Sequence, residues 1–566
     1  MEATITKSNG SSFVIEVRSV ASIDASRCVN CGECRESCPV DAIAETQRLI
    51  CRMCPTCTER PAMQPADMER IARETSCTTA CPLGISPQGY INLTAVCKEQ
   101  EAFAHIWKCN PLPSICGRIC THPCEEMCKR GMLVDEPMAI RGVKRYLSDT
   151  FADFTPNIYP RIYEERIAVI GAGPAGLSVA HRLSMLGYEV TIFDKELTAG
   201  GMMVKGIPEF RLPRDVVARD IARLDKAGIH FKLGVSIGRK QMEELKKDYD
   251  RIIIAAGSDT ATELTIDGWR KDGVFTALGF MDRVNHQQST WRHPGQVFVK
   301  GGDVVIIGGG AVAIDCARTA VRLGAKSATC VCIEGGMDVP CHTWELEEAR
   351  REGVQLLEKW APQKFVGHMN ALAGVSFAKV CNFAKATDGR ISFEVNAEET
   401  MGLPANIVIM AVGQKAAPIW KEYADDEQIA FAGEVLGKDR SVVDSMAAGV
   451  AVANQVDVSL RGRETRAAGT QRKLLVADIS ERIYPTNRLK IERPAMPVAD
   501  PEVRVKNFDE VETAYSKDVI DMEVRRCLQC GFSVIDSAIC IGCGVCSRVC
   551  PKGDVITMVK PNEGEV

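Results

Sequence analysis

The 566-residue sequence predicts an α/β protein in which two parallel-sheet domains, the second inserted into the first, follow a helical domain, with a small cysteine-rich module at each end. Three observations support this prediction. A glycine-rich strand–turn–helix pattern occurs at residues 167–186, and a second one occurs at residues 304–324. The 26 cysteines lie mostly outside these patterns, with fifteen in residues 28–128 and six in residues 527–550. Short apolar strands that alternate with helices are typical of Rossmann-like domains.

The composition is that of a globular protein with ample core, since 46% of the residues are hydrophobic and 25% are charged. The net charge of −5 gives no indication of a nucleic-acid partner. The N-terminus shows no basic segment followed by an apolar run, and no apolar stretch is long enough to span a bilayer. We therefore expect a cytoplasmic protein with no membrane insertion. In a cytoplasmic chain, clustered cysteines indicate metal sites rather than disulfides.

The first cysteine motif has the spacing of a ferredoxin. Cys28, Cys31, Cys34 and Cys38 form C-x2-C-x2-C-x3-C before Pro39. Three thiolates at this spacing wrap one corner of a [4Fe–4S] cubane, and the fourth cysteine usually binds a neighbouring cluster. A zinc site normally shows two separated C-x2-C pairs. The motif therefore favours an iron–sulfur cluster over zinc.

A second run of cysteines follows at Cys51, Cys54 and Cys57, but Pro61 stands where a fourth cysteine is expected. If Cys38 completes this second cluster, the first three cysteines have no fourth ligand inside the module. Two alternatives therefore stay open. Either a cysteine from further along the chain completes the first cluster, or the ligand scheme is rearranged.

Residues 62–150 are predicted to be helical, and their cysteines have a different spacing. Cys77 and Cys81 form C-x3-C-P, and four more cysteines follow at intervals of four residues. These are Cys116, Cys120, Cys124 and Cys128. On a helix this spacing places side chains on one face, where they could bind a cluster or form a packing stripe. The nearby C-P pair favours a cluster, whereas Cys97 and Cys109 stand alone and are expected in the core.

The first glycine-rich pattern begins after the apolar strand Ile167–Ile170. Gly171, Gly173 and Gly176 occur in the order G-x-G-x-x-G and open a helix. In this motif the first glycine permits a tight turn, the second lets the backbone approach a pyrophosphate, and the third lets helix and strand pack closely. The next strand ends at Asp194, eighteen residues past Gly176, where an acidic side chain accepts from a ribose hydroxyl. The pattern predicts a dinucleotide site, and the alternative is a glycine-rich turn with no ligand.

The second pattern begins with the apolar strand Val304–Ile307. Gly308, Gly310 and Ala313 follow as G-x-G-x-x-A, and the next strand ends at Glu334, twenty-one residues past Ala313. A carboxylate at this position accepts from a ribose 2′-hydroxyl and repels a 2′-phosphate. We therefore expect NADH to be favoured over NADPH. The alternative is a solvated glutamate, with specificity set elsewhere.

The ferredoxin spacing recurs near the C-terminus, at Cys540, Cys543, Cys546 and Cys550 before Pro551. This motif predicts a [4Fe–4S] cluster. Upstream lie Cys527 and Cys530, but Ser533 and Ser537 stand where a two-cluster module would have cysteines. A second C-terminal cluster therefore stays an open alternative.

The segment Asn110–Cys128, NPLPSICGRICTHPCEEMC, followed by the first glycine motif, resembles the small subunit of glutamate synthase and its relatives. These relatives include the N-terminal half of dihydropyrimidine dehydrogenase and the large subunit of NADH-dependent ferredoxin:NADP oxidoreductase. The resemblance covers roughly residues 75–455 and the C-terminal cluster segment. It implies FAD in the first dinucleotide fold, NAD(P)H in the second fold inserted into it, and two [4Fe–4S] clusters in the helical domain.

The resemblance also implies ligands for the two clusters of the helical domain. The matching cysteines are Cys77, Cys81, Cys120, Cys124 and Cys128. The family uses a C-x2-C pair just upstream, and the nearest pair here is Cys54 and Cys57, about twenty residues away. In the family a Gln or Glu near the domain's end binds one cluster. Lys144 stands at the matching position and cannot bind as an ammonium, so Cys116 is a candidate to fill the gap.

Further nucleotide contacts are implied by the resemblance. The family shares the segment Gly206–Pro213 along the flavin, and it has Gly-Asp where this chain has Gly433-Glu434. Relatives that use NADPH carry an arginine pair where this chain has Ile333-Glu334, which supports NADH. The flavin segment has no C-x4-C pair, which argues against a disulfide reductase. The segment Ile407–Gln414, IVIMAVGQ, is expected to return the chain to the first domain.

With the residues that flank the glycine motifs, these positions make up the candidate cofactor-binding residues. They are Gly171, Ala172, Gly173, Pro174, Ala175, Gly176, Asp194, Lys195, Gly200, Gly201, Met202, Arg211, Ala256, Gly257, Gly308, Gly309, Gly310, Ala311, Val312, Ala313, Glu334, Val412, Gly413, Gly433 and Glu434.

Six regions follow from these motifs. They are a ferredoxin-like [4Fe–4S] module at 1–61, a helical iron–sulfur domain at 62–160, an FAD-binding domain at 161–295 and 425–460, an NAD(H)-binding domain at 296–424, a connector extended over the surface at 461–515, and a second ferredoxin-like module at 516–566.

FAD can exchange hydride with a nicotinamide and single electrons with clusters, so it would join the second dinucleotide fold to the cysteine motifs. Hydride transfer needs stacking and orientation rather than a side-chain acid or base, so we nominate no catalytic residue. We expect FAD, NAD(H) in preference to NADP(H), and about four to five [4Fe–4S] clusters.

The first functional hypothesis is an NADH-handling electron-transfer subunit of a larger anaerobic redox complex, or one that acts toward ferredoxin. Its partners would be other redox subunits in a hetero-oligomer. Two enzymatic alternatives are a stand-alone NAD(P)H-dependent reductase of a small substrate and a glutamate synthase small subunit. A non-enzymatic alternative is a cluster-bearing scaffold with regulatory nucleotide sites.

Overall fold

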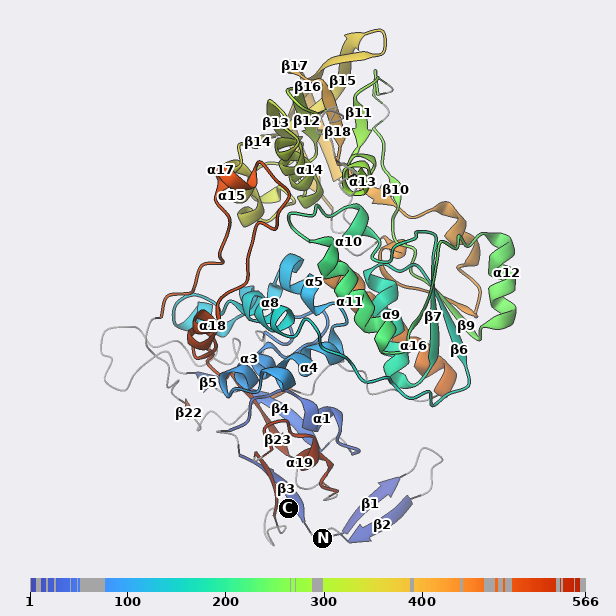
Figure 1. Ribbon diagram of the computed structural model, residues 1–566, viewed down its shortest axis with the longest axis vertical. Coiled ribbons are helices and arrows are strands. Elements are labelled where there is room, and N and C mark those ends of the chain that lie inside the picture. The colour runs from blue at the N-terminus through green and yellow to red at the C-terminus, as the bar shows by residue number, and fades with distance from the viewer. Residues whose placement is uncertain are drawn as a thin grey trace. The chain divides into compact units, whose positions relative to one another are not determined.

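The computed structural model describes most of the chain (Figure 1). The described residues are 2–6, 12–16, 19–24, 27–40, 42–47, 49–50, 77–264, 266–269, 271–287, 299–386, 391–437, 441–462, 474–476, 482–483, 491–535, 540, 543–553 and 555–559. The chain divides into two compact units. Unit 1 comprises residues 1–156, 454–496 and 514–566, and unit 2 comprises residues 157–453 and 497–513. Across the described residues, every helix is too short or too polar to cross a membrane.

Unit 2 contains a first parallel sheet with the strand order β20-β9-β6-β7-β8. Its strands are β6 (Arg166–Ile170), β7 (Glu189–Asp194), β8 (His230–Leu233), β9 (Arg251–Ile254) and β20 (Ile429–Phe431). Its helices are α9 (Pro174–Leu186), α10 (Met202–Lys205), α11 (Arg214–Lys226) and α12 (Arg239–Asp248), and α16 (Val442–Arg461) follows the last strand. Figure 1 shows α12 on the opposite side of this sheet from α9 and α11. The strand, glycine turn and helix predicted from residue 167 onward are all present.

The two faces of this sheet are buried because side chains alternate along each strand. Ala168 and Ile170 of β6 pack in one core cluster with Met242 and Leu245 of α12. Val169 points the other way, toward Gly176 of α9. This explains why the strands of the sheet are continuous apolar runs rather than alternating ones.

A second parallel sheet has the order β11-β18-β12-β13-β14. Its strands are β11 (Val274–Thr276), β12 (Asp303–Ile307), β13 (Ser327–Cys332), β14 (Gln355–Glu358) and β18 (Ile407–Met410). Its helices are α13 (Ala277–Gln287), α14 (Ala311–Arg322) and α15 (Thr343–Arg351). Because β11 to β18 lie between β9 and β20 in the sequence, this domain is inserted into the first, as the sequence predicts.

An antiparallel sheet covers the second parallel sheet on the face away from the helices. It consists of β15 (Trp360–His368), β16 (Ala371–Lys385) and β17 (Ile391–Pro404), in that order. Val305 and Val408 pack with Phe365 and Phe377 of this sheet, whereas Ile306 belongs to the separate cluster on the helical face. The sequence analysis did not anticipate this layer. Figure 1 shows β16 and β17 running as a long ribbon beyond the second sheet.

Short segments complete unit 2. They are β10 (Thr260–Ala261), which pairs with β19 (Gln414–Lys415), the 3-10 turns Gly336–Asp338, Pro418–Tyr423 and Gly433–Leu436, and α17 (Pro501–Arg504). The last lies in the stretch expected to be a connector extended over the surface. Most described residues of that stretch are exposed or half-buried. It is anchored at Arg504, which is 2% exposed, and at Val511, whose N–H donates to the Phe210 carbonyl at 2.9 Å.

Unit 1 holds a group of short helices. They are α3 (Pro87–Ala95), α4 (Glu99–Cys109), α5 (Pro113–Ile119), α6 (Pro123–Glu126), α7 (Lys129–Leu133), α8 (Ile140–Thr150) and α18 (Lys517–Val524). The helices α5 and α8 pack closely, since a Cβ on Gly117 would lie 2.9 Å from the Cα of Arg145. Phe103 stacks on Phe151 and meets Phe154 edge to face, which gives this group its own apolar core. The helical character predicted for this region is present from residue 87 onward.

The two ends of the chain pair within unit 1. Strand β3 (Val20–Ile23) runs antiparallel to β24 (Ile556–Val559), and β4 (Ile43–Gln47) runs antiparallel to β23 (Gly531–Ile535). The remaining elements are β1 (Glu2–Thr6), β2 (Ser12–Glu16), β5 (Leu49–Ile50), β21 (Leu474–Val476), β22 (Arg482–Ile483), α1 (Glu33–Glu36) and α19 (Val545–Val549). Val20, Ile43, Val555 and Ile556 share one buried cluster. The two terminal segments, each expected to be a module, are therefore brought together around a common core.

Candidate functional site

The first glycine motif forms a tight loop between β6 and α9. Gly171 has a φ of +111°, and a Cβ there would lie 2.3 Å from the carbonyl oxygen of Ala255. A Cβ on Gly176 would lie 1.9 Å from the carbonyl oxygen of Gly171, so only glycine lets the helix pack this closely. Around the Cβ position of Gly173, by contrast, no neighbouring atom lies within 4 Å. The backbone there is open to a ligand, which fits an approaching pyrophosphate.

Asp194 ends β7 and braces this loop. Its Oδ2 accepts a hydrogen bond from the Ala172 N–H at 2.6 Å, and its Oδ1 accepts one from the Glu196 N–H at 2.9 Å. A carboxylate oxygen can accept two hydrogen bonds, so Asp194 retains acceptor capacity for a ribose hydroxyl. Its neighbour Lys195, also predicted to contact the cofactor, forms an ion pair with Asp259.

Other flavin candidates gather around this loop at the carboxyl ends of the strands, the edge at which open α/β sheets bind ligands. The Gly200 N–H donates to the Ala172 carbonyl at 2.9 Å, and a Cβ on Gly201 would lie 2.9 Å from the Cα of Gly173. Pro174 and Ala175 begin α9. The candidates placed at this edge outside the loop are Gly200, Gly201, Met202, Ala256, Gly257, Gly433 and Glu434.

Arg211, expected along the flavin, is held by two carboxylates of the inserted domain. Its guanidinium donates to Asp315 and Glu345, each at 2.7 Å, and these carboxylates belong to α14 and α15 of the second domain. Burial alone would lower the pKa of Arg211, but the two carboxylates raise it. Arg211 therefore ties the segment before α11 to the nucleotide domain inserted into the first.

The segment Ile407–Gln414 begins with β18, which pairs with β12 and β11 in the second sheet. After β18 the chain runs through β19 to β20, which pairs with β9 of the first sheet. Val412 and Gly413 follow β18 at the carboxyl edge of the second sheet, where the Gly413 carbonyl accepts from the Thr262 N–H at 2.9 Å.

The second glycine motif repeats the geometry of the first. Gly308 has a φ of +135°, and a Cβ there would lie 2.5 Å from the Ala411 carbonyl oxygen. Gly309 backs onto Cys332, and the Cβ position of Gly310 meets only Pro340, at 3.7 Å or more. The residues Ala311, Val312 and Ala313 form the first turn of α14. The loop therefore leaves the same open approach to its helix N-terminus as the first motif does.

Glu334 follows β13, at the edge where the sequence places it. Burial raises the pKa of Glu334, and Lys385 opposes this rise. The Lys359 N–H donates to the Glu334 carbonyl at 3.0 Å, and the Lys359 side chain lies against Gly335. Lys359 could not be singled out from the sequence, because its place at this turn depends on the pairing of β14 with β13.

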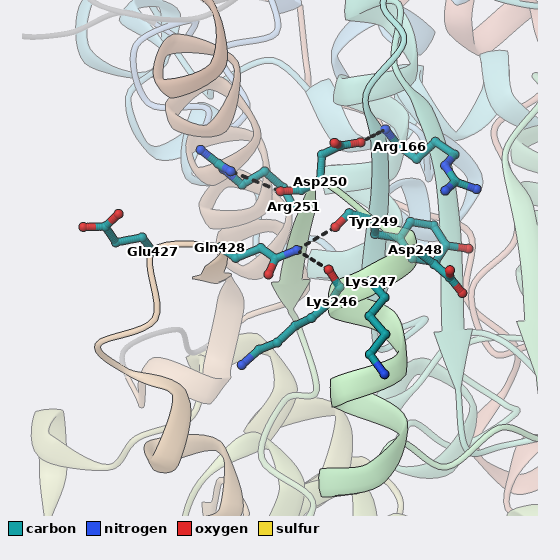
Figure 2. Close-up of a pocket in the computed structure, with 9 residues that line it drawn as sticks. All are labelled: Arg166, Lys246, Lys247, Asp248, Tyr249, Asp250, Arg251, Glu427 and Gln428. Carbon is teal, nitrogen blue, oxygen red and sulfur yellow. Dashed lines mark hydrogen bonds between the residues drawn. The ribbon is translucent and has the colours of Figure 1, made fainter.

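A cavity with a volume of about 480 Å³ lies elsewhere. Figure 2 shows its lining residues, which include Arg166, Arg251, Tyr249 and Gln428. Arg166 and Arg251 begin β6 and β9, so this cavity lies at the amino ends of the strands. Because nucleotides bind at the carboxyl ends, we assign it no part in cofactor binding.

The ferredoxin motifs at the two ends of the chain exchange their fourth cysteines. One cavity is lined by Cys28, Cys31, Cys34 and Cys550, which we call the first ferredoxin quartet. Another is lined by Cys38, Cys540, Cys543 and Cys546, the second ferredoxin quartet. Backbone N–H groups donate to sulfur in this module, from Asn30 to Cys28 at 3.4 Å and from Ala42 to Cys38 at 3.3 Å. Of the alternatives left open by the sequence, a cysteine from further along the chain is the one that completes the first set.

A third set lies in the helical part of unit 1. Cys77, Cys128, Cys527 and Cys530 line a common cavity, and we call them the tail quartet. Here the C-terminal C-x2-C pair stands where the resemblance led us to expect Cys54 and Cys57. Those two cysteines and Cys51 lie outside the described residues.

The protein holds the tail pair in place with specific contacts. Gln88 donates to the Gly531 carbonyl at 2.6 Å and accepts from its N–H at 2.8 Å. Arg130, which is buried, donates to the Arg526 carbonyl at 2.7 Å. The Asn92 side chain donates to the sulfur of Cys527 at 3.7 Å, and the Met138 N–H donates to that of Cys128 at 3.5 Å. A sequence search could not find this pairing, because the two halves are about 400 residues apart in the printed chain.

A fourth set of cysteines is recognised by its electrostatic effect on a buried lysine, Lys144. Burial lowers the pKa of Lys144, but Cys120, Cys116, Cys124 and Cys81, as thiolates, raise it above its usual value. We call these four cysteines the helical quartet. The Cys120 sulfur accepts from the His122 N–H at 3.4 Å.

The donor sets fit iron–sulfur cubanes better than single metal ions. Among the described residues, no three Cys, His, Asp or Glu side chains converge closely enough to bind one ion. A zinc ion draws each sulfur to about 2.3 Å, whereas a cubane holds its four thiolates on four different irons. Burial raises the pKa of Cys31, Cys77, Cys81 and Cys124, and that of Cys527 to about 11. Thiolates in these positions therefore require a compensating cation, which iron supplies.

Three family models match the chain. The pyridine nucleotide-disulphide oxidoreductase model matches residues 165–440. The model for dihydropyrimidine dehydrogenase domain II, 4Fe-4S cluster, matches residues 45–155. The 4Fe-4S binding domain model matches residues 21–44 and 533–554, which contain the two ferredoxin motifs.

Curated relatives extend this similarity over most of the chain. The chain is 31% identical to the NADP(+)-dependent formate dehydrogenase subunit beta of Moorella thermoacetica over 80% of its own length and 70% of that protein. It is 30% identical to the glutamate synthase [NADPH] small chain of Azospirillum brasilense, over 60% of its length and 72% of that protein. It is 28% identical to the NAD-dependent dihydropyrimidine dehydrogenase subunit PreT of Escherichia coli, over 74% and 98%. The chain spans about half the length of some other relatives that it matches.

Proposed function

The chain belongs to the family of FAD- and NAD(P)H-dependent iron–sulfur oxidoreductases that includes the glutamate synthase small chain, and on that premise we propose that it passes electrons between NADH, FAD and [4Fe–4S] clusters within a larger redox complex. The observation that carries this proposal is the presence of four cysteine quartets in the same chain as two dinucleotide loops. The names of the reported relatives describe subunits or chains of larger enzymes. This supports a hetero-oligomer in which the chain meets other redox subunits or ferredoxin. A reducing compartment such as the cytoplasm suits thiolate ligands.

FAD is assigned to the first glycine loop. The open backbone at Gly173 would face the pyrophosphate, Asp194 would accept from the ribose, and the loop Gly200-Gly201 would cover the dinucleotide from the side. FAD supplies both hydride exchange and single-electron exchange, and the chain's residues bind and orient it. No side chain is assigned an acid or base role, because hydride transfer between stacked rings needs none.

Four [4Fe–4S] clusters are assigned to the four quartets. The first and second ferredoxin quartets would form one two-cluster module from both ends of the chain, and the tail and helical quartets would serve the two clusters of the helical region. The crossing of Cys38 and Cys550 supports this count, since paired ferredoxin motifs share fourth cysteines in this way. A fifth cluster at Cys51, Cys54 and Cys57 is not part of the proposal.

NADH is preferred over NADPH in this proposal. The carboxylate of Glu334 follows β13, where it would accept from the 2′-hydroxyl of the adenosine ribose and repel a 2′-phosphate. Lys359 and Lys385 lie near this turn and would soften the repulsion. Two of the three reported relatives carry NADP or NADPH in their names and the third carries NAD, so the preference is argued from Glu334 of this chain and not from the relatives.

The preference is tested by Glu334→Arg. We expect the ratio of kcat/KM for NADH over NADPH to fall by on the order of tenfold or more, about 1.4 kcal/mol per tenfold. Asp338→Arg places the same charge at a nearby exposed position and serves as the matched control. An unchanged ratio in Glu334→Arg would remove Glu334 from the specificity site.

The function as a whole is tested by an anaerobic titration of the purified protein, first with NADH and then separately with NADPH, followed in the visible spectrum. Bleaching of both flavin and cluster absorption by substoichiometric NADH is expected. Turnover with ferredoxin or a viologen, but with no small organic acceptor, separates the proposal from a stand-alone reductase. If neither NADH nor NADPH bleached the flavin, the cluster-bearing scaffold would be favoured instead.

A further inference from the structure

Asn30 belongs to the walls of two cysteine cavities in unit 1. It lines the cavity of the first ferredoxin quartet, and it also lines the cavity of the tail quartet. Asn30 is only 2% exposed, so the wall at this point is protein rather than solvent. The two cavities are therefore separated there by a single residue.

The backbone of Asn30 is held in an unusual conformation. Its φ is +54°, in the left-handed region, which asparagine adopts more readily than most residues. Its N–H donates to the Cys28 sulfur at 3.4 Å, its carbonyl accepts from the Ser86 hydroxyl at 2.7 Å, and its side-chain oxygen accepts from Arg35 at 2.7 Å. Asn30 is thus bound both to the first ferredoxin quartet and, through Ser86, to the start of α3.

Helix α3 contacts both cysteine sites. Ser86 caps its first turn by accepting from the Gly89 N–H at 3.1 Å. A Cβ on Gly89 would lie 2.8 Å from the Cα of Cys31, so the helix backbone packs directly against the loop of the first ferredoxin quartet. Gln88 and Ile91 of the same helix line the cavity of the tail quartet. One helix therefore sets the spacing between the two sites.

Further contacts tie the first ferredoxin quartet to the helical group. The Nδ1 atom of His105 on α4 lies 3.1 Å from the carboxylate of Glu33, which stands between two cysteines of the quartet. Lys98, just before α4, donates to the carbonyl of Pro551, which follows Cys550. Both halves of the quartet are therefore fixed to α4, and the separation of the two sites is a property of the fold.

We propose that the first ferredoxin quartet and the tail quartet bind neighbouring [4Fe–4S] clusters, and that Asn30 is the positioning residue across which single electrons pass between them. One cluster loses one electron and the other gains it, with no bond formed or broken, and NADH supplies the electrons through FAD. The tail quartet thereby joins the helical region to the two-cluster module built from the chain ends. This inference rests on the proposed function and deepens it, because it gives two of the four clusters their order.

A charge placed at Asn30 tests whether both sites meet there. Asn30→Asp keeps the size of the side chain and the acceptor for Arg35, but it adds a negative charge, which disfavours the more negative, reduced state of a cluster close to it. A reductive titration followed by EPR should show lower midpoint potentials for two clusters at once. A shift of one cluster alone, or of none, would overturn the shared wall.

The matched control for this substitution is Gln88→Glu. It adds the same charge at a residue that lines the cavity of the tail quartet but not that of the first ferredoxin quartet. The same titration should therefore show a lower midpoint potential chiefly for one cluster. Equal shifts of two clusters in both variants would mean that Asn30 has no special position, which also overturns the proposal.

The electron path is tested with Asn30 left intact. Cys527→Ala with Cys530→Ala removes two ligands of the tail quartet, and Cys97→Ala, at an exposed cysteine, is the control. After rapid mixing with NADH, freeze-quench EPR should find the ferredoxin clusters of the double variant still oxidised at times when those of the parent and the control are reduced. FAD should bleach in all three proteins, and dithionite should reduce the ferredoxin clusters in all three.

Two outcomes of this experiment have different meanings. Reduction of the ferredoxin clusters by NADH at the parent rate in the double variant would overturn the path through the tail quartet. A parent protein in which NADH bleaches no flavin would contradict the proposed function itself. The EPR titration of Asn30→Asp does not depend on NADH, so it decides the shared wall in either case.

Discussion

The two units of the molecule build their sites in opposite ways. In unit 2 each glycine loop is complete within one strand–turn–helix unit, and its acidic residue stands at the end of the next strand (Asp194) or two residues beyond it (Glu334). In unit 1 three of the four cysteine quartets combine residues from opposite ends of the chain. A dinucleotide site can therefore be recognised in a short stretch of sequence, whereas a cluster site of this protein cannot.

The difference has a physical origin in the ligands. A pyrophosphate is bound by consecutive backbone N–H groups at one helix N-terminus, so neighbouring residues supply the whole site. A cubane presents four irons in four directions, and the last direction can be filled by any segment that folding brings near. Joining distant segments also lowers the conformational entropy of the unfolded chain. The clusters would therefore stabilise the pairing of the two chain ends within unit 1.

The largest expected effect, a loss of iron, tests whether the cluster sites of unit 1 combine cysteines from both ends of the chain. Double cysteine variants measure it. Cys28→Ala with Cys550→Ala removes two ligands of one quartet and should cost about four irons, whereas Cys38→Ala with Cys550→Ala strikes both ferredoxin quartets and should cost about eight. Iron and sulfide analysis after anaerobic purification measures the difference. If each terminal motif kept its own fourth cysteine, both double variants would strike both clusters and each would cost about eight irons.

The next effect concerns the tail quartet. Cys527→Ala with Cys530→Ala should remove about four irons while FAD stays bound, because unit 2 supplies its own nucleotide site. Cys97→Ala, at an exposed cysteine that belongs to none of the four sets, is the matched control. Retention of all iron in the double variant would show that Cys77 and Cys128 take their partners elsewhere.

The opposite result, a loss of FAD with retention of iron, is expected from Gly171→Ala. Its Cβ would lie 2.3 Å from a backbone oxygen at a φ of +111°, so the loop must distort and FAD binding should be lost or weakened at least tenfold. Gly402→Ala meets no atom within 4 Å and serves as the control. The cluster iron should be retained in both variants, and FAD bound to Gly171→Ala at the parent affinity would contradict the role of this loop.

A smaller effect is expected at the buried charge cluster of unit 2. Glu352 accepts from Arg318 and Arg322, each at 2.6 Å, and also pairs with Arg504 at 2.8 Å. Glu352→Gln leaves these arginines without their carboxylate and should destabilise unit 2 by about 3–5 kcal/mol. Denaturant-induced release of FAD measures this, and Glu422→Gln, which breaks an exposed pair with Arg239, should change it little.

Glu352 also makes the stability of unit 2 depend on pH. Burial opposes ionisation of Glu352, but Arg318 and Arg322 lower its pKa to about 2, below the ordinary 4.5. A carboxyl with a lowered pKa stabilises the fold above its unfolded pKa and loses that contribution as the pH falls. The stability difference between the parent protein and Glu352→Gln should therefore shrink as the pH falls from about 4.5 toward 2. A difference that stays constant over this range would contradict the assignment.

Much of the fold and part of the site could be predicted from particular residues. Ile167–Gly176 and Val304–Ala313 specify strand, turn and helix by local sterics, and both loops have the geometry expected. The strand Ile407–Met410 lies within the second domain predicted at 296–424, but its neighbours in the sheet, β11 and β12, are known only from the structure. The antiparallel layer over the second sheet was missed, although Ile391, Phe393 and Val395 of β17 alternate with polar residues as in a strand.

What the sequence alone determined were the sites whose atoms come from adjacent residues: the two nucleotide loops, and the three-cysteine half of each ferredoxin motif. The tertiary structure decided which fourth cysteine meets each half and which pair faces Cys77 and Cys128. It also showed that Arg211 pairs with Asp315 and Glu345 of the inserted domain. Local motifs depend on backbone geometry within a few turns, whereas these choices depend on which distant side chains are buried together, and burial is a property of the folded chain alone.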